Sequence, residues 1–153
     1  MKKGLKVFIA LLLIIAIGCT IWYYSTFRYN LGLYSVNLIS ANTVYDSYYE
    51  ETYLVVHYSF TNHTSSPVSF RDVIEHHAYQ GGIELWQVLF YGSADIPHYS
   101  NYSQKVRPGV SIEVDVAYYI LDDDAITTVE VNSPTFLWWY YTRSWDLYLG
   151  HPA

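Results

Sequence analysis

From Tyr34 onward, apolar and polar residues alternate with a period of two in several short segments, which is the pattern of half-buried β-strands. Residues 54–61 place Leu, Val, Tyr and Phe at the even positions and direct Val55, His57, Ser59 and Thr61 to the other face. Residues 111–118 repeat the pattern after the turn dipeptide Pro108-Gly109. There the residues predicted to face the core are Ile112, Val114, Val116 and Tyr118, and those predicted to face outward are Ser111, Glu113, Asp115 and Ala117.

Weaker patterns predict further strands at 34–38, 68–70, 77–80, 83–89, 102–106, 128–131 and 135–143. Gly81-Gly82 predicts a tight hairpin, because both glycines accept positive φ. Residues 45–51 read as a polar loop or hairpin, 90–101 as a long loop, and 72–77 as a place where one helical turn could form.

About seven or eight short strands without an amphipathic helix indicate an all-β domain. The alternation of apolar and polar residues indicates sheets with one solvent-exposed face, which favours an immunoglobulin-like two-sheet sandwich over a closed barrel. The domain would cover residues 34–150, after a short stalk at 25–33.

The N-terminus adds a transmembrane or signal-anchor helix to this fold. Lys2, Lys3 and Lys6 precede an apolar run that ends in an aromatic belt, and residues 5–24 supply the ~20 residues that cross a bilayer as a helix. The lysines predict a cytoplasmic N-terminus and an extracellular C-terminal domain. Residues 1–24 are thus expected to hold the protein in the cytoplasmic membrane.

A second interpretation is a lipoprotein signal, with Cys19 as the lipidated residue after Ala16-Ile17-Gly18. The apolar stretch, however, continues through 21–24, where lipoproteins usually carry a polar tether, and Ala16 replaces the expected leucine. Ordinary secretion is the third interpretation. All three place the rest of the chain outside the cytoplasmic membrane.

Charge and cysteine content narrow the function. From Ser25 onward the chain has five basic and fourteen acidic residues, a net charge of −9, so nucleic-acid binding is not expected. Cys19 is the only cysteine, which excludes disulfides and thiolate metal sites from the exterior domain.

Polar clusters give few candidates for chemistry. His76 and His77, with Asp72, Glu75 and His98, could form a zinc or copper site, but neighbouring residues of a strand point to opposite faces. Residues 122–124 lack the alternating spacing of a calcium loop. No nucleophile or phosphate motif is present. We therefore expect no metal site, no cofactor, no catalytic residue and no enzyme activity.

Aromatic residues are the strongest functional signal. The chain has 18 tyrosines and five tryptophans, and residues 136–141 are almost wholly aromatic. If those rings are exposed, they offer a rigid contact surface, for which the candidates are Trp138, Trp139, Tyr140 and Tyr141. They could instead pack under a loop or rest on the membrane surface. Tyr45, Tyr48, Tyr49 and Tyr53 are expected to be half-buried cross-strand partners.

Three segments together resemble a known family: 54–62 (LVVHYSFTN), 78–85 (AYQGGIEL) and 106–123, which begins VRPG and ends LDD. Their order resembles the bacterial domain-of-unknown-function family 5067, exported domains found mainly in Gram-positive bacteria. The resemblance covers residues 34–132. It implies an immunoglobulin-like sandwich similar to that of small secreted immunoprotective antigens of mycobacteria, and it implies no catalytic residues.

The resulting hypothesis is a membrane-anchored interaction module at the bacterial cell surface. Its partner would be a cell-envelope protein, a peptide or a glycan. A structural, self-associating envelope subunit is the alternative, and a metal carrier or an enzyme ranks below both.

Overall fold

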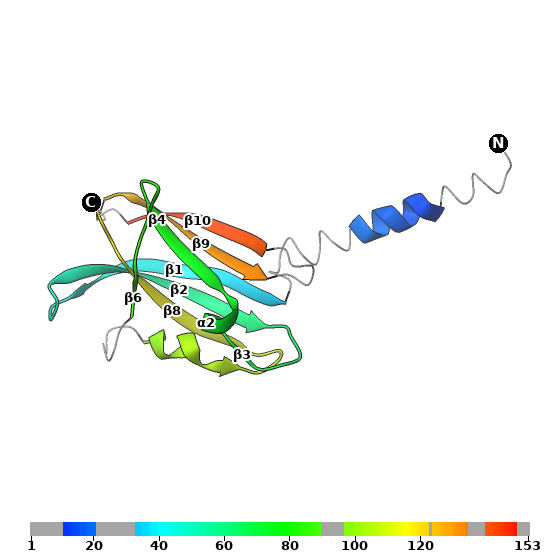
Figure 1. The fold of residues 1–153 in the computed structure, drawn as a ribbon, viewed down its shortest axis with the longest axis horizontal. Helices are drawn as coiled ribbons and strands as arrows, with labels where there is room; N and C mark the ends of the chain where they lie inside the picture. Colours follow the sequence, from blue (N-terminus) through cyan, green and yellow to red (C-terminus); the bar gives the residue numbers. More distant parts are fainter. Residues whose placement is uncertain (1–10, 21–32, 90–96, 123, 135–139, 150–153) are drawn as a thin grey trace.

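The computed structural model describes residues 11–20, 33–89, 97–122, 124–134 and 140–149. These residues form a mostly β protein in which two four-stranded antiparallel sheets enclose a common core (Figure 1). The all-β prediction is therefore confirmed for the described chain.

Each sheet combines two or three long strands with one or two short ones. The first has the order β1 (Tyr34–Asp46), β2 (Glu51–Asn62), β8 (Ser111–Tyr119) and β6 (Gln87–Val88). The second has the order β10 (Tyr140–Tyr148), β9 (Ile126–Pro134), β4 (Glu75–Gln80) and β5 (Ile83–Glu84). Around them lie the pair β3 (Val68–Ser69) and β7 (Lys105–Val106), the helical turn α2 (Phe70–Val73) and the 3-10 helix η1 (Tyr99–Ser103).

The strand order has a simple relation to the chain order. With β3 and β7 set aside, the strands can be lettered A, B, C, C′, D, E, F and G along the chain. The sheets then read A-B-E-D and G-F-C-C′. This is the order in which immunoglobulin-type sandwiches arrange these strands.

The core lies between the two sheets and follows the predicted alternation. Leu54, Val56, Tyr58 and Phe60 of β2 are fully buried there, and Val129 and Val131 of β9 face them from the other sheet. Phe70 of α2 inserts its ring between the sheets, with centroids 5.9 Å from Tyr58 and 5.5 Å from Phe60. Burial of this much aromatic surface is the main term that stabilises such a fold.

The outward face of β8 differs from the prediction. Asp115 and Ala117, expected in solvent, are only 3% and 0% exposed. The reason is that η1 packs over this part of the first sheet, where a second small apolar cluster includes Val88 of the neighbouring strand β6. Its buried members are Tyr53, Val55, Val88 and Ala117.

Several element boundaries also need correction. The helical turn lies at Phe70–Val73 rather than at 72–77, because β4 begins at Glu75. Of the strand expected at 102–106, the first two residues belong to η1, and only Lys105–Val106 pairs as a strand. Within the expected 45–51 loop or hairpin, residues 47–50 form the turn of the long β1–β2 hairpin, and the residues on either side already pair as strands. The hairpin at Gly81-Gly82 is confirmed, with φ of +56° and +81°.

Within the N-terminal region, the structure describes residues 11–20, which are helical. The remainder of the expected 1–24 anchor and nearly all of the 25–33 stalk lie outside the described residues. In the part of the chain that the structure describes, no helix has the length and apolar character needed to cross a membrane.

Candidate metal-binding site

The outer face of the first sheet carries a cluster of ionisable side chains where β2 pairs with β8. His57 of β2 lies directly opposite Asp115 of β8, and Ser59 lies opposite Glu113. Tyr58 and Val114 alternate with these residues and point into the core. The alternation that builds the core therefore places His57, Glu113 and Asp115 together on the opposite face.

Asp115 fixes the orientation of the neighbouring histidine. Its carboxylate is buried and can only accept hydrogen bonds, so the Nδ1–H group of His57 donates to its Oδ1 atom over 2.5 Å. The other ring nitrogen of His57, Nε2, then carries the lone pair when the ring is neutral. This arrangement of carboxylate and imidazole is typical of histidines that bind a metal ion through Nε2.

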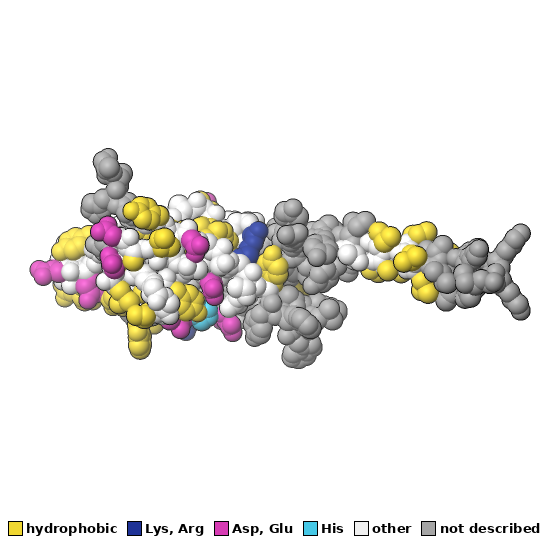
Figure 2. Space-filling model, turned by 90° about the horizontal axis from the view of Figure 1, so that it is seen from above, with side chains coloured by type: hydrophobic (Ala, Val, Ile, Leu, Met, Phe, Trp, Pro, Cys, Tyr) yellow, Lys and Arg dark blue, Asp and Glu magenta, His cyan; other side chains and the backbone are white. Residues whose placement is uncertain are grey.

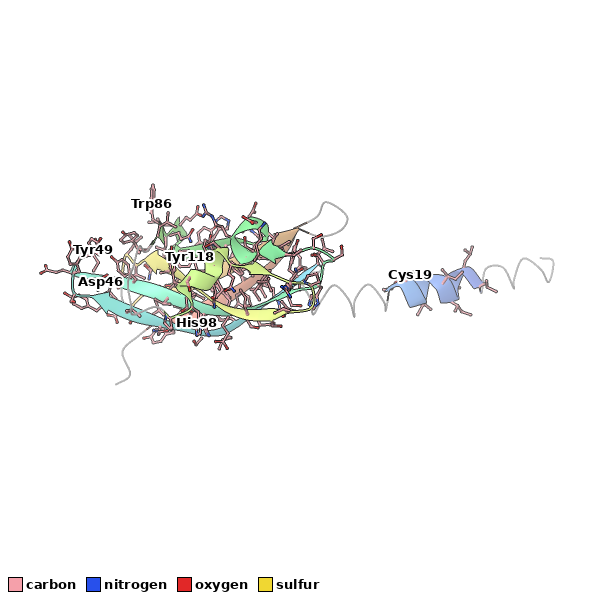
Figure 3. The ribbon with its side chains drawn as sticks, turned by 90° about the horizontal axis from the view of Figure 1, so that it is seen from below. Cys19, Asp46, Tyr49, Trp86, His98 and Tyr118 are labelled. Carbon is pink, nitrogen blue, oxygen red and sulfur yellow. The ribbon has the colours of Figure 1, made fainter. Side chains whose placement is uncertain are left out.

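His98 reaches the cluster from a different element. It lies at the N-cap position of η1, and its backbone N–H donates to Asp115 Oδ2 over 3.0 Å. That contact brings its ring to a centroid distance of 5.0 Å from His57. Figure 3 shows His98 beside the strands of the first sheet, outside the core that holds Tyr118.

The three remaining donor atoms converge on one point. The Nε2 atoms of His57 and His98 lie 3.4 Å and 3.2 Å from Glu113 Oε2, and all three atoms lie within 4.8 Å of one another. Ligand atoms around a tetrahedral zinc ion lie about 3.3–3.4 Å apart, given Zn–N bonds of about 2.0–2.1 Å. The two separations from Glu113 therefore fit a zinc-sized ion, and both imidazoles lie near enough to bind the same ion.

Electrostatics favours a cation at this point. Two carboxylates face two imidazoles, and His57 directs its Nε2 atom at a Glu113 oxygen. Two electron-rich atoms at that separation repel each other unless a proton or a metal ion lies between them. A divalent ion would neutralise both carboxylates and use all three donor atoms.

Two of the three histidines that the sequence analysis singled out have other roles. His76 points inward, and its two ring nitrogens contact the hydroxyl groups of Tyr118 at 2.6 Å and Tyr102 at 2.9 Å. His77 contacts the Glu84 carboxylate at 2.6 Å. The predicted opposite orientation of these two neighbours is confirmed, and of that candidate set only His98 belongs to the cluster at β2 and β8.

His76 is a buried, neutral histidine. Desolvation lowers the pKa of His76 to about 4, and the neighbouring His77 adds a smaller effect of the same sign. Burial also raises the pKa of Tyr118, so its hydroxyl stays protonated as a partner for His76. The three side chains His76, Tyr102 and Tyr118 thus connect η1 to the core through uncharged hydrogen bonds.

Other sequence candidates lie apart from the cluster. Asp122 Oδ1 accepts from the backbone N–H of Asp124, which is a solvated turn. Cys19 is exposed on the N-terminal helix. Trp138, Trp139 and the side chain of Tyr140 lie outside the described residues, and Tyr141 is half-buried against the core.

The comparisons with known proteins concern the fold and the family. A family model described as "Domain of unknown function (DUF5067)" matches residues 22–133, a range that includes all four residues of the cluster. A solved structure, "Structure of a putative lipoprotein from Staphylococcus aureus subsp. aureus NCTC 8325", is similar with a TM-score of 0.53 at 10% sequence identity. The match covers 73% of this chain and 82% of that one, and at this identity it shows the fold alone. Comparison with curated proteins gives no match.

The neutral His76 predicts a loss of stability in acid. The unfolded chain binds a proton at this residue near its ordinary pKa of 6.5, whereas the folded chain does so only near 4. The free energy of unfolding should therefore fall as pH drops through that window, by up to about 3 kcal/mol from this residue. Urea unfolding at pH 7 and pH 4.5 measures the loss.

The variant His76→Gln is the matched comparison, because it removes this titration and leaves every other ionisable group in place. We expect its stability to depend less on pH than that of the wild-type protein. Equal pH dependence in the two proteins would contradict the assignment.

Proposed function

The chain belongs to the DUF5067 family of domains of unknown function, and we propose that it is an envelope-attached, immunoglobulin-like domain that binds a divalent transition-metal ion. The observation that carries the proposal is the convergence of His57 Nε2, His98 Nε2 and the Glu113 carboxylate, with Asp115 holding His57 in the metal-binding tautomer. The sequence analysis expected no metal site, so this proposal departs from it.

The donor set selects the class of ion. Two imidazoles and one carboxylate suit Zn²⁺, Cu²⁺ or Ni²⁺, whereas Ca²⁺ and Mg²⁺ require shells of oxygen ligands. Zn²⁺ is our choice, because the separations at Glu113 match a tetrahedral ion and no thiolate or thioether ligand is among the three donors.

The proposed attachment to the cytoplasmic membrane rests on the N-terminal region, and the proposed Gram-positive source rests on the family resemblance alone. The large apolar side chains of residues 11–17 are more than half exposed on the helix, a surface that fits contact with lipid tails. The lysines before it fit a cytoplasmic N-terminus. The name of the structurally similar staphylococcal protein fits the alternative, attachment through a lipid on Cys19.

A second proposed role is interaction with a partner at the end of the sandwich that bears the β1–β2 turn. Tyr48, Tyr49 and Trp86 are there 83%, 63% and 82% exposed, and the Tyr119 backbone N–H donates to the Trp86 carbonyl from the adjacent strand. Tyr45, Tyr48 and Tyr49 are therefore exposed rather than half-buried as the sequence predicted, and Tyr53 is fully buried. Figure 2 shows acidic side chains among apolar ones at this end, and Figure 3 labels Tyr49 and Trp86 there.

Exposed rings of this kind fit a glycan, a peptide or an envelope protein, or a second copy of the chain. They form a surface distinct from the metal cluster, so the two roles can be tested separately.

Metal binding is tested by calorimetric titration of the full chain, in detergent, with zinc chloride. We expect one zinc ion per chain and an increase in melting temperature with zinc concentration. His57→Ala or His98→Ala should lower the affinity by at least about tenfold, and Asp115→Asn should do so without removing a ligand. His77→Ala is the control, because His77 contacts Glu84 on the other sheet.

One result would exclude the proposal. Zinc that produces neither heat nor a thermal shift at neutral pH would show that the two histidines only pair with the carboxylates.

The mode of attachment is tested by mass spectrometry of the native, membrane-extracted protein. We expect a chain that retains residues 1–18, and Cys19→Ser should leave it in the membrane fraction. A diacylated Cys19 at the N-terminus would instead show lipoprotein processing and contradict the uncleaved anchor.

The interaction role is tested by sedimentation of the full chain with purified cell-wall glycan. The double variant Tyr49→Ser/Trp86→Ser should weaken binding but change stability by no more than about 0.5 kcal/mol, because both side chains are largely in solvent. Val110→Ser, at the opposite end of β8, is the control. Equal binding by all variants would exclude this surface for glycan, and concentration-dependent association of the wild-type protein alone would identify self-pairing.

A further inference from the structure

We infer that the metal site keeps one coordination position open to solvent and works by ligand exchange, so that the bound ion is passed to an acceptor that supplies the missing donor. This inference rests on the proposed metal binding and concerns how the same site releases its ion. It assigns the protein to metal transfer rather than to structural metal storage.

The first argument is the number of protein ligands. Among the described residues, three donor atoms converge at the cluster, from His57, His98 and Glu113. The nearby carboxylate of Asp115 is committed elsewhere, because its Oδ1 accepts from His57 and its Oδ2 accepts from the His98 backbone. A tetrahedral ion held by three protein ligands leaves its fourth position to water or to an incoming ligand.

The second argument is the exposure of the three ligands. The side chains of His57, His98 and Glu113 are 17%, 37% and 53% exposed. The sheet closes the side of the site next to His57, and the side next to Glu113 faces solvent. Structural zinc sites are closed by four protein ligands, whereas sites that exchange ligands keep an accessible position.

The third argument is that the ligands are held to different degrees. His57 is fixed by the buried Asp115, and His98 is tied to the same residue through its backbone. The Glu113 carboxylate is the most exposed of the three. An acceptor that binds at the open position would therefore displace Glu113 first and the histidines afterwards.

The exchange needs no redox partner. A donor atom of the acceptor molecule forms a bond to the ion while the Glu113–metal bond breaks. The two histidine–metal bonds break afterwards. After release of the ion, His98 Nε2 again lies 3.2 Å from Glu113 Oε2, which is the arrangement that the structure shows.

The chain offers a variant that would close the site. Ser59 lies directly opposite Glu113 in the pairing of β2 with β8 and is half-buried on the same face as His57. The substitution Ser59→His places a further imidazole next to the ion. The matched control is Ser144→His on the exposed face of β10 in the other sheet.

The experiment measures zinc transfer from the loaded full chain, in detergent, to the chelator 4-(2-pyridylazo)resorcinol by stopped-flow absorbance. For the wild-type protein and Ser144→His, the rate should rise in proportion to the chelator concentration, because the chelator enters the open position. Ser59→His should transfer zinc at least about tenfold more slowly.

A wild-type rate that does not depend on chelator concentration would overturn the inference, because the ion would then leave before the acceptor binds. Failure of the proposed metal binding gives a different result, namely a protein that retains no zinc after loading and desalting.

If Ser59→His does not fold, cobalt-loaded wild-type protein provides the second measurement. Its visible absorption bands should shift when imidazole is added, since imidazole enters the open position. Bands that stay unchanged would also overturn the inference.

Discussion

The antiparallel pairing of β2 with β8 sets both the core and the candidate site. With Tyr58 opposite Val114, the apolar residues of both strands enter the space between the sheets. The same register places His57 opposite Asp115 on the outer face. A slip of one residue would move the polar side chains into the core, so the hydrophobic effect that fixes the register also fixes the cluster.

Burial of Asp115 is what distinguishes the candidate metal-binding site from an ordinary solvated sheet face. A carboxylate withdrawn from water needs hydrogen-bond donors, and here a ring N–H of His57 and the backbone N–H of His98 supply them. η1 is held nearby through the contact of Tyr102 with His76, and its first turn positions His98. Core packing and ligand geometry are thus connected through one short helix.

The DUF5067 assignment and the fold leave the activity open, since the family is described as a domain of unknown function and a fold does not determine function. The metal cluster and the exposed aromatic end suit different ligands and lie on different parts of the sandwich. Taken together, the proposals describe an envelope-attached domain with a metal-exchange site on one sheet face. The aromatic end, with Tyr49 and Trp86, remains available for a partner.

The sequence by itself determined the all-β class, the alternation that buries residues such as Tyr58 and Val129, and the hairpin at Gly81-Gly82, because each depends on local spacing or local φ preference. Only the tertiary structure decided the site. His57 and Asp115 are 58 positions apart, and nothing in either segment states which strands pair or in what register. The sequence analysis singled out His98 but grouped it with His76, because a sequence identifies residues that are close along the chain and not those that are close in space. Burial of Asp115 likewise depends on η1, which packs over β8 through a non-local contact that a periodicity of two does not record.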